Sequence, residues 1–83
     1  MIVDLTTSKR LLDSGELVSA IVVPRPWVEE EQWVVKLEKA NGETELFTRA
    51  RTSDLKTYKS LRAAVRDAER IGLSEVRVQL TNS

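Results

Sequence analysis

The fold is decided by residues 58–76, YKSLRAAVRDAERIGLSEV. Ser60 is a favourable N-cap, because its hydroxyl can accept a hydrogen bond from a free N–H of the first helical turn. Gly72, followed by the apolar Leu73, fits a Schellman-type helix ending. Between them, apolar side chains recur at the spacing of a helix with one buried face. These are Leu61, Ala64, Val65, Ala68 and Ile71. The stretch predicts an amphipathic helix that crosses one face of a sheet.

Upstream of this helix, Asn41-Gly42 lies between two strand-like segments, 32–40 and 43–50. Asn-Gly is the strongest short hairpin signal, because a type I′ turn needs positive φ at both central residues. A two-residue turn pairs Leu37 with Leu46. It places Trp33, Val35 and Leu37 on one face with Leu46, Thr48 and Ala50. The opposite face carries Lys36, Glu38, Glu45 and Arg49, with Val34 and Phe47 as exceptions.

Two further strands and a short helix complete the pattern. Residues 17–23, LVSAIVV, are apolar on both alternations, with Leu17, Ile21 and Val23 on one side. This pattern predicts a strand that is central in the sheet or covered on both faces. Pro24 and Pro26 end it, because proline has no N–H to donate to a neighbouring strand. Residues 75–80 predict a last strand with Val76, Val78 and Leu80 inward. Asp4 and Gly15 bracket a predicted helix at 5–14.

The order of elements predicts an α+β fold. We expect a single α-β-β-β-α-β two-layer domain over residues 1–83. Three strands form an antiparallel meander, the long helix lies across one face, and a fourth strand returns. If all strands share one sheet, the last runs parallel to the segment 43–50 through a right-handed crossover.

Composition restricts the class of protein. The 83 residues contain 41% hydrophobic side chains and few aromatics, which predicts a small aliphatic core with marginal stability or added burial in a homodimer. The 13 basic and 13 acidic residues cancel, but the first half is acidic and residues 47–83 are basic. This asymmetry is typical of a binding face, and it also arises by chance in short chains.

The absence of histidine and cysteine excludes the usual zinc and copper ligands and the usual general base. Glu29-Glu30-Glu31 is the one metal-like feature, and such a run is more typical of a solvated acidic turn. Glu38 and Glu45, opposed across the predicted hairpin, would repel each other. We therefore expect no enzyme, no catalytic or metal-binding residue and no cofactor.

Targeting signals are likewise missing from the sequence. Residues 1–10, MIVDLTTSKR, do not resemble a signal peptide, and the longest apolar run, AIVV, is far too short for a membrane span. Together with the lack of cysteine, this predicts a soluble, cytoplasmic protein with no membrane partner.

Candidate binding residues concentrate on the long helix. Arg62, Arg66 and Arg70 are one turn apart, with Lys59 just before them. Like charges at this spacing destabilise a helix slightly, so helix stability does not explain them. They form either an edge that faces an anion, such as nucleic-acid phosphates or an acidic protein surface, or a solvated face. Nucleic-acid binding would require Arg49, Arg51 and Arg77 to converge with them.

Trp27 lies in a proline-bounded loop, outside the strand periodicity. It is either a binding anchor, including a platform for base stacking, or a lid that packs over the sheet edge.

A family resemblance rests on Phe47-Thr48, Ala50-Arg51, residues 58–65 (YKSLRAAV), residues 71–73 (IGL) and residues 76–78 (VRV). This pattern resembles small uncharacterised bacterial proteins encoded on plasmids and integrated elements, some labelled partition- or stability-associated. It covers about the C-terminal half, with an echo in residues 14–23. The resemblance implies a mobile-element setting and brings no site residue with it.

The sequence thus predicts a non-catalytic interaction module that self-associates, with a homodimer expected, and serves a plasmid or mobile-element function through a protein partner. The alternative is a nucleic-acid-binding domain that uses the basic helix edge, which the neutral total charge disfavours.

Overall fold

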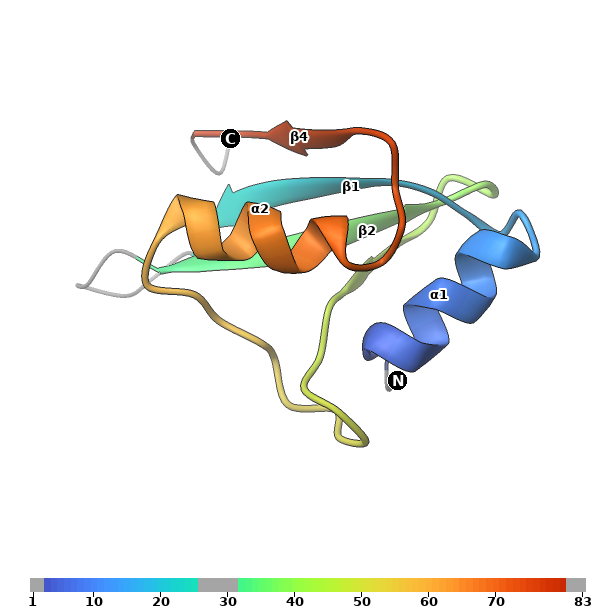
Figure 1. The fold of residues 1–83 in the computed structure, drawn as a ribbon, viewed down its shortest axis with the longest axis horizontal. Coiled ribbons are helices and arrows are strands. Elements are labelled where there is room, and N and C mark those ends of the chain that lie inside the picture. The colour runs from blue at the N-terminus through green and yellow to red at the C-terminus, as the bar shows by residue number, and fades with distance from the viewer. Residues whose placement is uncertain (1–2, 26–31, 81–83) are drawn as a thin grey trace.

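The computed structural model describes residues 3–25 and 32–80 of the chain. The elements follow the predicted order and confirm the α+β class. They are α1 (Leu5–Asp13), β1 (Leu17–Pro24), β2 (Trp33–Lys39), β3 (Thr44–Leu46), α2 (Leu61–Glu69) and β4 (Val76–Val78). Figure 1 shows α2 lying across one face of the sheet and α1 near one end of it.

The strands form one mixed sheet in the order β3-β2-β1-β4. The antiparallel meander of β1, β2 and β3 is confirmed, and β1 is central, as its apolar character on both alternations predicts. β4 runs in the same direction as β3, but it pairs with β1, with Ala20 opposite Val76 and Val22 opposite Val78. Since β2 already has a partner on each edge, the returning strand could add only beside β1 or β3.

The predicted hairpin register is wrong by one residue. Leu37 lies opposite Glu45, and Lys36 lies opposite Leu46. The connection has three residues, because the Lys39 N–H donates to the Glu43 carbonyl (2.8 Å) and the Lys39 carbonyl accepts from the Gly42 N–H (3.0 Å). Only Gly42 in this turn has positive φ, +90°, as in a type I turn followed by a glycine bulge.

This one-residue shift exchanges the two faces of β3. Phe47, an exception in the predicted pattern, is fully buried, and its N–H donates to the Val35 carbonyl (2.9 Å). Leu46, predicted to face the core beside Leu37, is instead 44% exposed. The largest fully buried side chain of the core therefore comes from the residue after β3.

A β-bulge in β1 corrects a second face assignment. Leu17 pairs with Lys39 and Ser19 with Glu38, so Val18 is the extra residue. The bulge resets the alternation of the strand. Leu17 consequently packs on the same side as Ala20, not on the side of Ile21, and Val18 is exposed.

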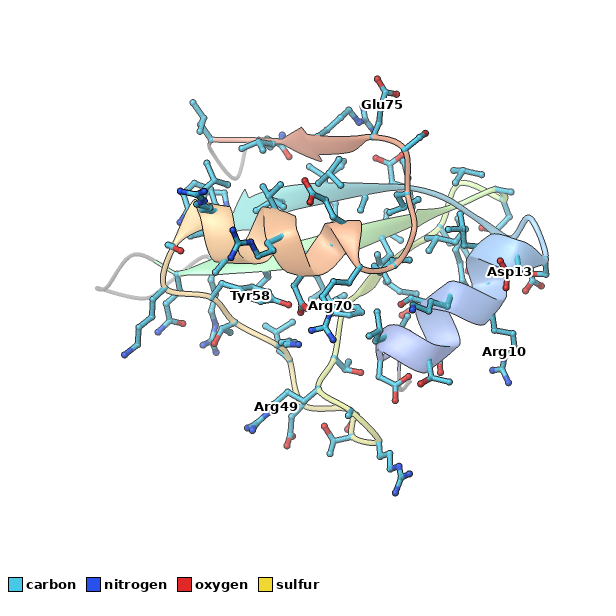
Figure 2. The ribbon with its side chains drawn as sticks, in the orientation of Figure 1. Arg10, Asp13, Arg49, Tyr58, Arg70 and Glu75 are labelled. Atoms are coloured by element: carbon cyan, nitrogen blue, oxygen red, sulfur yellow. The ribbon has the colours of Figure 1, made fainter. Side chains whose placement is uncertain are left out.

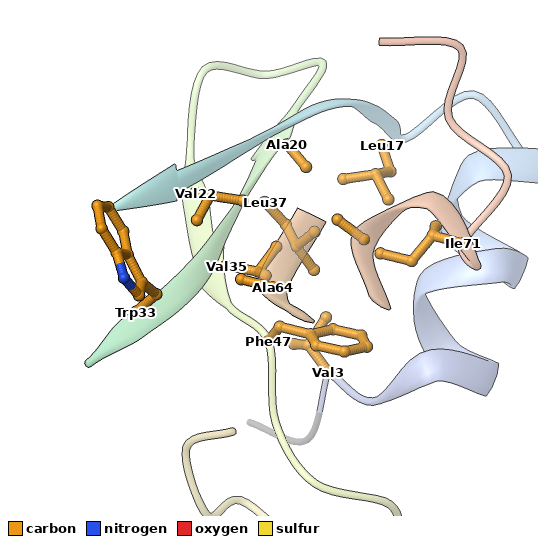
Figure 3. Close-up of a cluster of buried hydrophobic side chains, with 11 residues drawn as sticks. Val3, Leu17, Ala20, Val22, Trp33, Val35, Leu37, Phe47, Ala64 and Ile71 are labelled. Atoms are coloured by element: carbon orange, nitrogen blue, oxygen red, sulfur yellow. The ribbon is translucent and has the colours of Figure 1, made fainter. Parts of the chain in front are cut away.

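The core lies between α2 and the sheet (Figure 3). The predicted stripe is confirmed, since Ala64 and Ala68 of α2 are fully buried and Ile71, just after α2, is nearly so. The buried cluster consists of Val3, Leu17, Ala20, Val22, Trp33, Val35, Leu37, Phe47, Ala64, Ala68 and Ile71.

Both helices begin at their predicted caps. Asp4 Oδ1 accepts from the Thr7 N–H (3.0 Å), and Ser60 Oγ accepts from the Ala63 N–H (3.2 Å). Each bond satisfies a backbone donor that has no partner inside its helix.

Replacement of Ala68 by Glu tests the docking of α2. The substitution buries a carboxylate with no partner against the sheet, and we expect it to lower the free energy of unfolding by about 3–5 kcal/mol. The matched control is Ala63→Glu, at an exposed position of the same helix, which should change stability by less than about 0.5 kcal/mol. Equal melting temperatures for the two variants would contradict the packing described.

A second pair of variants tests the register of β3. Phe47→Ala should cost about 3–5 kcal/mol because it leaves a cavity in the core. Leu46→Ala removes an exposed side chain and should cost less than about 1 kcal/mol. The register expected from a two-residue turn predicts the reverse order, so urea denaturation of the two variants distinguishes the alternatives.

Candidate functional site

The arginines of α2 line an open depression on the molecular surface. Arg62, Arg66 and Arg70 are all exposed and share it with Lys56 and Tyr58 from the segment before the helix. Its volume is about 430 Å³, and its remaining lining residues are Ser60, Ala63 and Asp67. We call this feature the α2 depression.

A buried carboxylate organises the floor of the α2 depression. Asp67 is only 7% exposed. Its Oδ2 atom lies 2.6 Å from Lys56 Nζ and accepts a hydrogen bond from the Tyr58 hydroxyl. Its Oδ1 atom lies 3.3 Å from Arg70 Nη1. In Figure 2, the labelled side chains of Tyr58 and Arg70 lie close together, one from the segment before α2 and one from the end of α2.

These contacts set the protonation states of the floor. Burial raises the pKa of Asp67, but hydrogen bonds from Lys56 and Tyr58, with the charges of Lys56 and Arg70, outweigh it and hold the pKa below its usual value. Burial, followed by the hydrogen bond to Asp67 and its negative charge, raises the pKa of Tyr58 well above its usual value. At neutral pH the floor is therefore an ionised carboxylate held by a neutral phenol.

Lys56 connects this floor to the core. Its Nζ atom lies 5.6 Å from the centre of the Phe47 ring and 5.8 Å from the centre of the Tyr58 ring. Both separations fall within the range of a cation–π contact. The position of Lys56 thus follows from the packing of Phe47 as well as from the charge of Asp67.

The α2 depression carries an excess of positive charge. Lys56 and Arg70 share the single carboxylate of Asp67. Within residues 3–25 and 32–80, no acidic side chain forms an ion pair with Arg62 or Arg66. Two guanidinium groups thus stand exposed without a counter-ion from the described part of the chain.

The other candidate cations do not line this depression. Lys59 is exposed just before the helix cap, and Figure 2 places Arg49 on the segment between β3 and α2. Arg51 lies on the same segment with φ of +61°, and its N–H donates to Asp4 Oδ2 (2.9 Å). Arg77 lies opposite Ile21, on the sheet face away from α2, and its guanidinium binds Glu38.

Two candidate features lie outside the described residues, namely Trp27 and the run 29–31. The prediction that Glu38 and Glu45 are opposed is wrong, because the register pairs Glu38 with Thr44. Each carboxylate has its own cation instead, Arg77 for Glu38 and Lys39 for Glu45 (3.9 Å).

Three residues of the depression were missed by the sequence reasoning: Lys56, Tyr58 and Asp67. Asp67 carried a signal, since it follows Ala64 by three residues and precedes Ile71 by four, which places it within the apolar stripe. A carboxylate at such a position requires partners. Nothing in the local sequence indicates that Lys56 and Tyr58 supply them, because that depends on the path of the preceding segment.

In the described part of the chain, no cluster of acidic side chains could hold a metal ion, and no helix is long and apolar enough to cross a membrane. No protein-family model, curated protein or solved structure matches the chain. The resemblance to plasmid and integrated-element proteins stays a prediction.

The ionised state of Asp67 makes stability depend on acid pH. Because its pKa is lower in the folded chain than in the unfolded chain, its contribution is complete above about pH 4 and is lost as the pH falls through the folded value. We expect Asp67→Asn to lower the free energy of unfolding by about 1–3 kcal/mol at pH 7. The difference from the parent should shrink below pH 4, as measured by urea denaturation.

Tyr58→Phe serves as the matched control for this pH dependence. It removes one donor to Asp67 but retains the carboxylate, so it should cost about 1 kcal/mol at pH 7 and keep most of the acid dependence of the parent. A parent and an Asp67→Asn variant with parallel stability curves from pH 7 to pH 2 would contradict the assigned role of Asp67.

Proposed function

We propose that the protein is a non-catalytic interaction module that binds an acidic segment of a protein partner in the α2 depression. The observation that carries this proposal is the state of Arg62 and Arg66. Both are exposed, and neither has an ion-pair partner among the described side chains, whereas Asp67 is already satisfied by Lys56, Tyr58 and Arg70. Carboxylates are the groups that these guanidiniums lack among the described residues, and a partner can supply them.

The spacing of the arginines fits a regular acidic partner. Successive positions in the row rise by about 6 Å along the helix axis. Carboxylates four residues apart on a partner helix have the same rise. Each guanidinium presents a planar fork of N–H donors that can hold one carboxylate with two hydrogen bonds.

The extent of the row favours a protein over a nucleic acid. Arg62 and Arg70 are two turns apart, which is about 12 Å. A surface of that length reaches only a few phosphates, whereas strongly salt-dependent DNA binders neutralise about 6–10. Arg77, which would have to extend the surface, faces the other side of the sheet and binds Glu38.

The protonation states of the depression support a non-catalytic role. Asp67 is the one carboxylate among the described residues of its lining, and its lowered pKa makes it a poor base at neutral pH. Tyr58, with a raised pKa, is protonated there and already donates to Asp67. Neither group is poised to exchange a proton with a substrate.

The proposal extends to the setting of the protein. On the resemblance of the C-terminal half, the partner belongs to a bacterial plasmid or integrated element. The protein and its partner interact in the cytoplasm, a location that the lack of cysteine supports.

Charge reversal tests the proposed surface. Poly-glutamate at low salt should shift the backbone amide signals of residues 56–70 in the parent, and added salt should weaken the effect. Arg62→Glu combined with Arg66→Glu should remove the response while leaving the fold intact, since both side chains point into solvent. NMR titration of labelled protein measures both.

The matched control is Lys9→Glu combined with Arg10→Glu on α1, which makes the same change in net charge at exposed positions away from the depression. It should bind poly-glutamate at the same residues as the parent. If duplex DNA binds the parent more tightly than poly-glutamate does, and the α2 variant alone loses that binding, the nucleic-acid alternative replaces our proposal. Equal responses of the two charge-reversed variants would show that the arginines form only a solvated face.

A further inference from the structure

β4 forms one edge of the sheet, and its apolar side chains are exposed there. Val78 is 42% exposed, and Leu80, just beyond the strand, is 73% exposed. Among the described strands, β1 alone pairs with β4, so the outer side of β4 has no strand beside it. Such an edge presents backbone donors and acceptors to any strand that can align with it.

We propose that a second copy of this chain pairs with β4 along this edge, antiparallel and related by a two-fold axis at Val78. The two four-stranded sheets would then join into one continuous sheet. This interface is separate from the proposed binding function. Figure 2 shows α2 between β4 on one side and the labelled Tyr58 and Arg70 side chains on the other.

The hydrogen bonds of β4 to β1 limit the possible registers. The Gln79 N–H donates to the Val22 carbonyl (2.9 Å), and Val22 lies opposite Val78. Backbone groups of successive strand residues point to alternate sides, so those of Val76 and Val78 point away from β1. Leu80 lies two residues beyond the strand, and pairing with a second copy would have to extend β4 to include it. An antiparallel partner must pair outward-pointing residues with outward-pointing residues. Two-fold registers centred on residue 77, 78 or 79 satisfy this condition.

Side-chain chemistry selects among these registers. A centre at Arg77 places two guanidiniums directly opposite each other, which is destabilising. A two-fold axis at Gln79 pairs Val78 with Leu80 but leaves Val76 with no apolar residue opposite it. A centre at Val78 places Val78 opposite its copy and Val76 opposite Leu80. It also places Arg77 opposite Gln79, so no like charges meet and every outward-pointing residue faces an apolar one.

A two-fold pairing of two copies suits this edge better than a head-to-tail pairing. The edge is self-complementary in apolar character and in charge, and a two-fold pairing closes after two chains. The edge on the β3 side is less regular, because the chain beyond Leu46 is bridged there by its own later residues, Thr48 to Leu55. The same pairing would also bury apolar surface that so small a domain leaves exposed.

Disulfide trapping tests the register directly, because the chain has no cysteine of its own. Cα atoms of a hydrogen-bonded antiparallel pair lie about 5.5 Å apart, within the range that a disulfide spans. Under oxidised glutathione, Val78→Cys should give a covalent dimer. Val76→Cys and Leu80→Cys should each stay largely monomeric alone and cross-link when mixed. Equal cross-linking of all three single variants, or none by Val78→Cys, would overturn the register.

Sedimentation equilibrium tests the uncross-linked dimer. Gln79→Glu places a carboxylate opposite Arg77 twice per dimer and should tighten the dissociation constant by about two- to thirtyfold, and Gln79→Lys should weaken it by a similar factor. Val78→Lys should abolish association. Leu46→Lys, at a residue of similar exposure on β3, is the matched control and should leave it unchanged.

A parent that stays monomeric at millimolar concentration would overturn this proposal, as would a dimer lost in Leu46→Lys and kept in Val78→Lys. The two proposals fail separately. Arg62→Glu combined with Arg66→Glu should dimerise as the parent does, and Val78→Lys should still bind poly-glutamate. Circular dichroism melting confirms that each variant is folded.

Discussion

The close packing of two alanines on the sheet determines the position of every other side chain on α2. Ala64 and Ala68 are fully buried, and their small size lets the helix backbone lie near β1 and β2. Once these residues face the sheet, helix geometry assigns the remaining positions. Arg62 and Arg66 turn to solvent, whereas Asp67 is carried to the flank of the helix beside Lys56 and Tyr58. The basic surface is therefore a consequence of how the core packs.

Asp67 then divides the arginines of the row into one that has an ion-pair partner, Arg70, and two that have none in the described part of the chain, Arg62 and Arg66. A carboxylate so nearly buried loses hydration, and this cost must be offset by donors from the protein. Lys56, Tyr58 and Arg70 supply them, and the carboxylate in turn fixes these side chains in place. Arg62 and Arg66 form no ion pair with Asp67. In the floor of the α2 depression, the charge of Asp67 thus offsets one of its two cations, whereas both guanidiniums of the exposed rim keep their full charge.

Local patterns predicted what depends on local geometry. The caps at Asp4 and Ser60, the stripe on α2 and the row of arginines all follow from helical spacing, and each element appears in its predicted place. The predicted register of β3 was wrong because Asn41-Gly42 suits either a two-residue or a three-residue turn, and both turns place Gly42 at a position of positive φ. The burial of Phe47 distinguishes them, and that depends on the whole core.

Relations between distant segments were harder to predict. The direction of β4 followed from the connectivity. Its neighbour was only partly indicated, because the apolar character of residues 17–23 on both alternations fits a central strand, which would need β4 beside it, as well as an edge strand covered on both faces. The bulge at Val18 changed the face of Leu17 with no glycine to mark it. Lys56 and Tyr58 joined the site through the course of residues 47–60, which has little regular structure.

The pairing of β4 with β1 also affects how the chain folds during translation. Of the four described strands, β1 leaves the ribosome first and β4 leaves it last. More than half of the chain is synthesised between the two partners. Throughout that interval the meander can form, but one side of its most apolar strand stays open to pairing with other nascent chains. The sheet is therefore completed late, and the exposed strand is the kind of segment that chaperones protect.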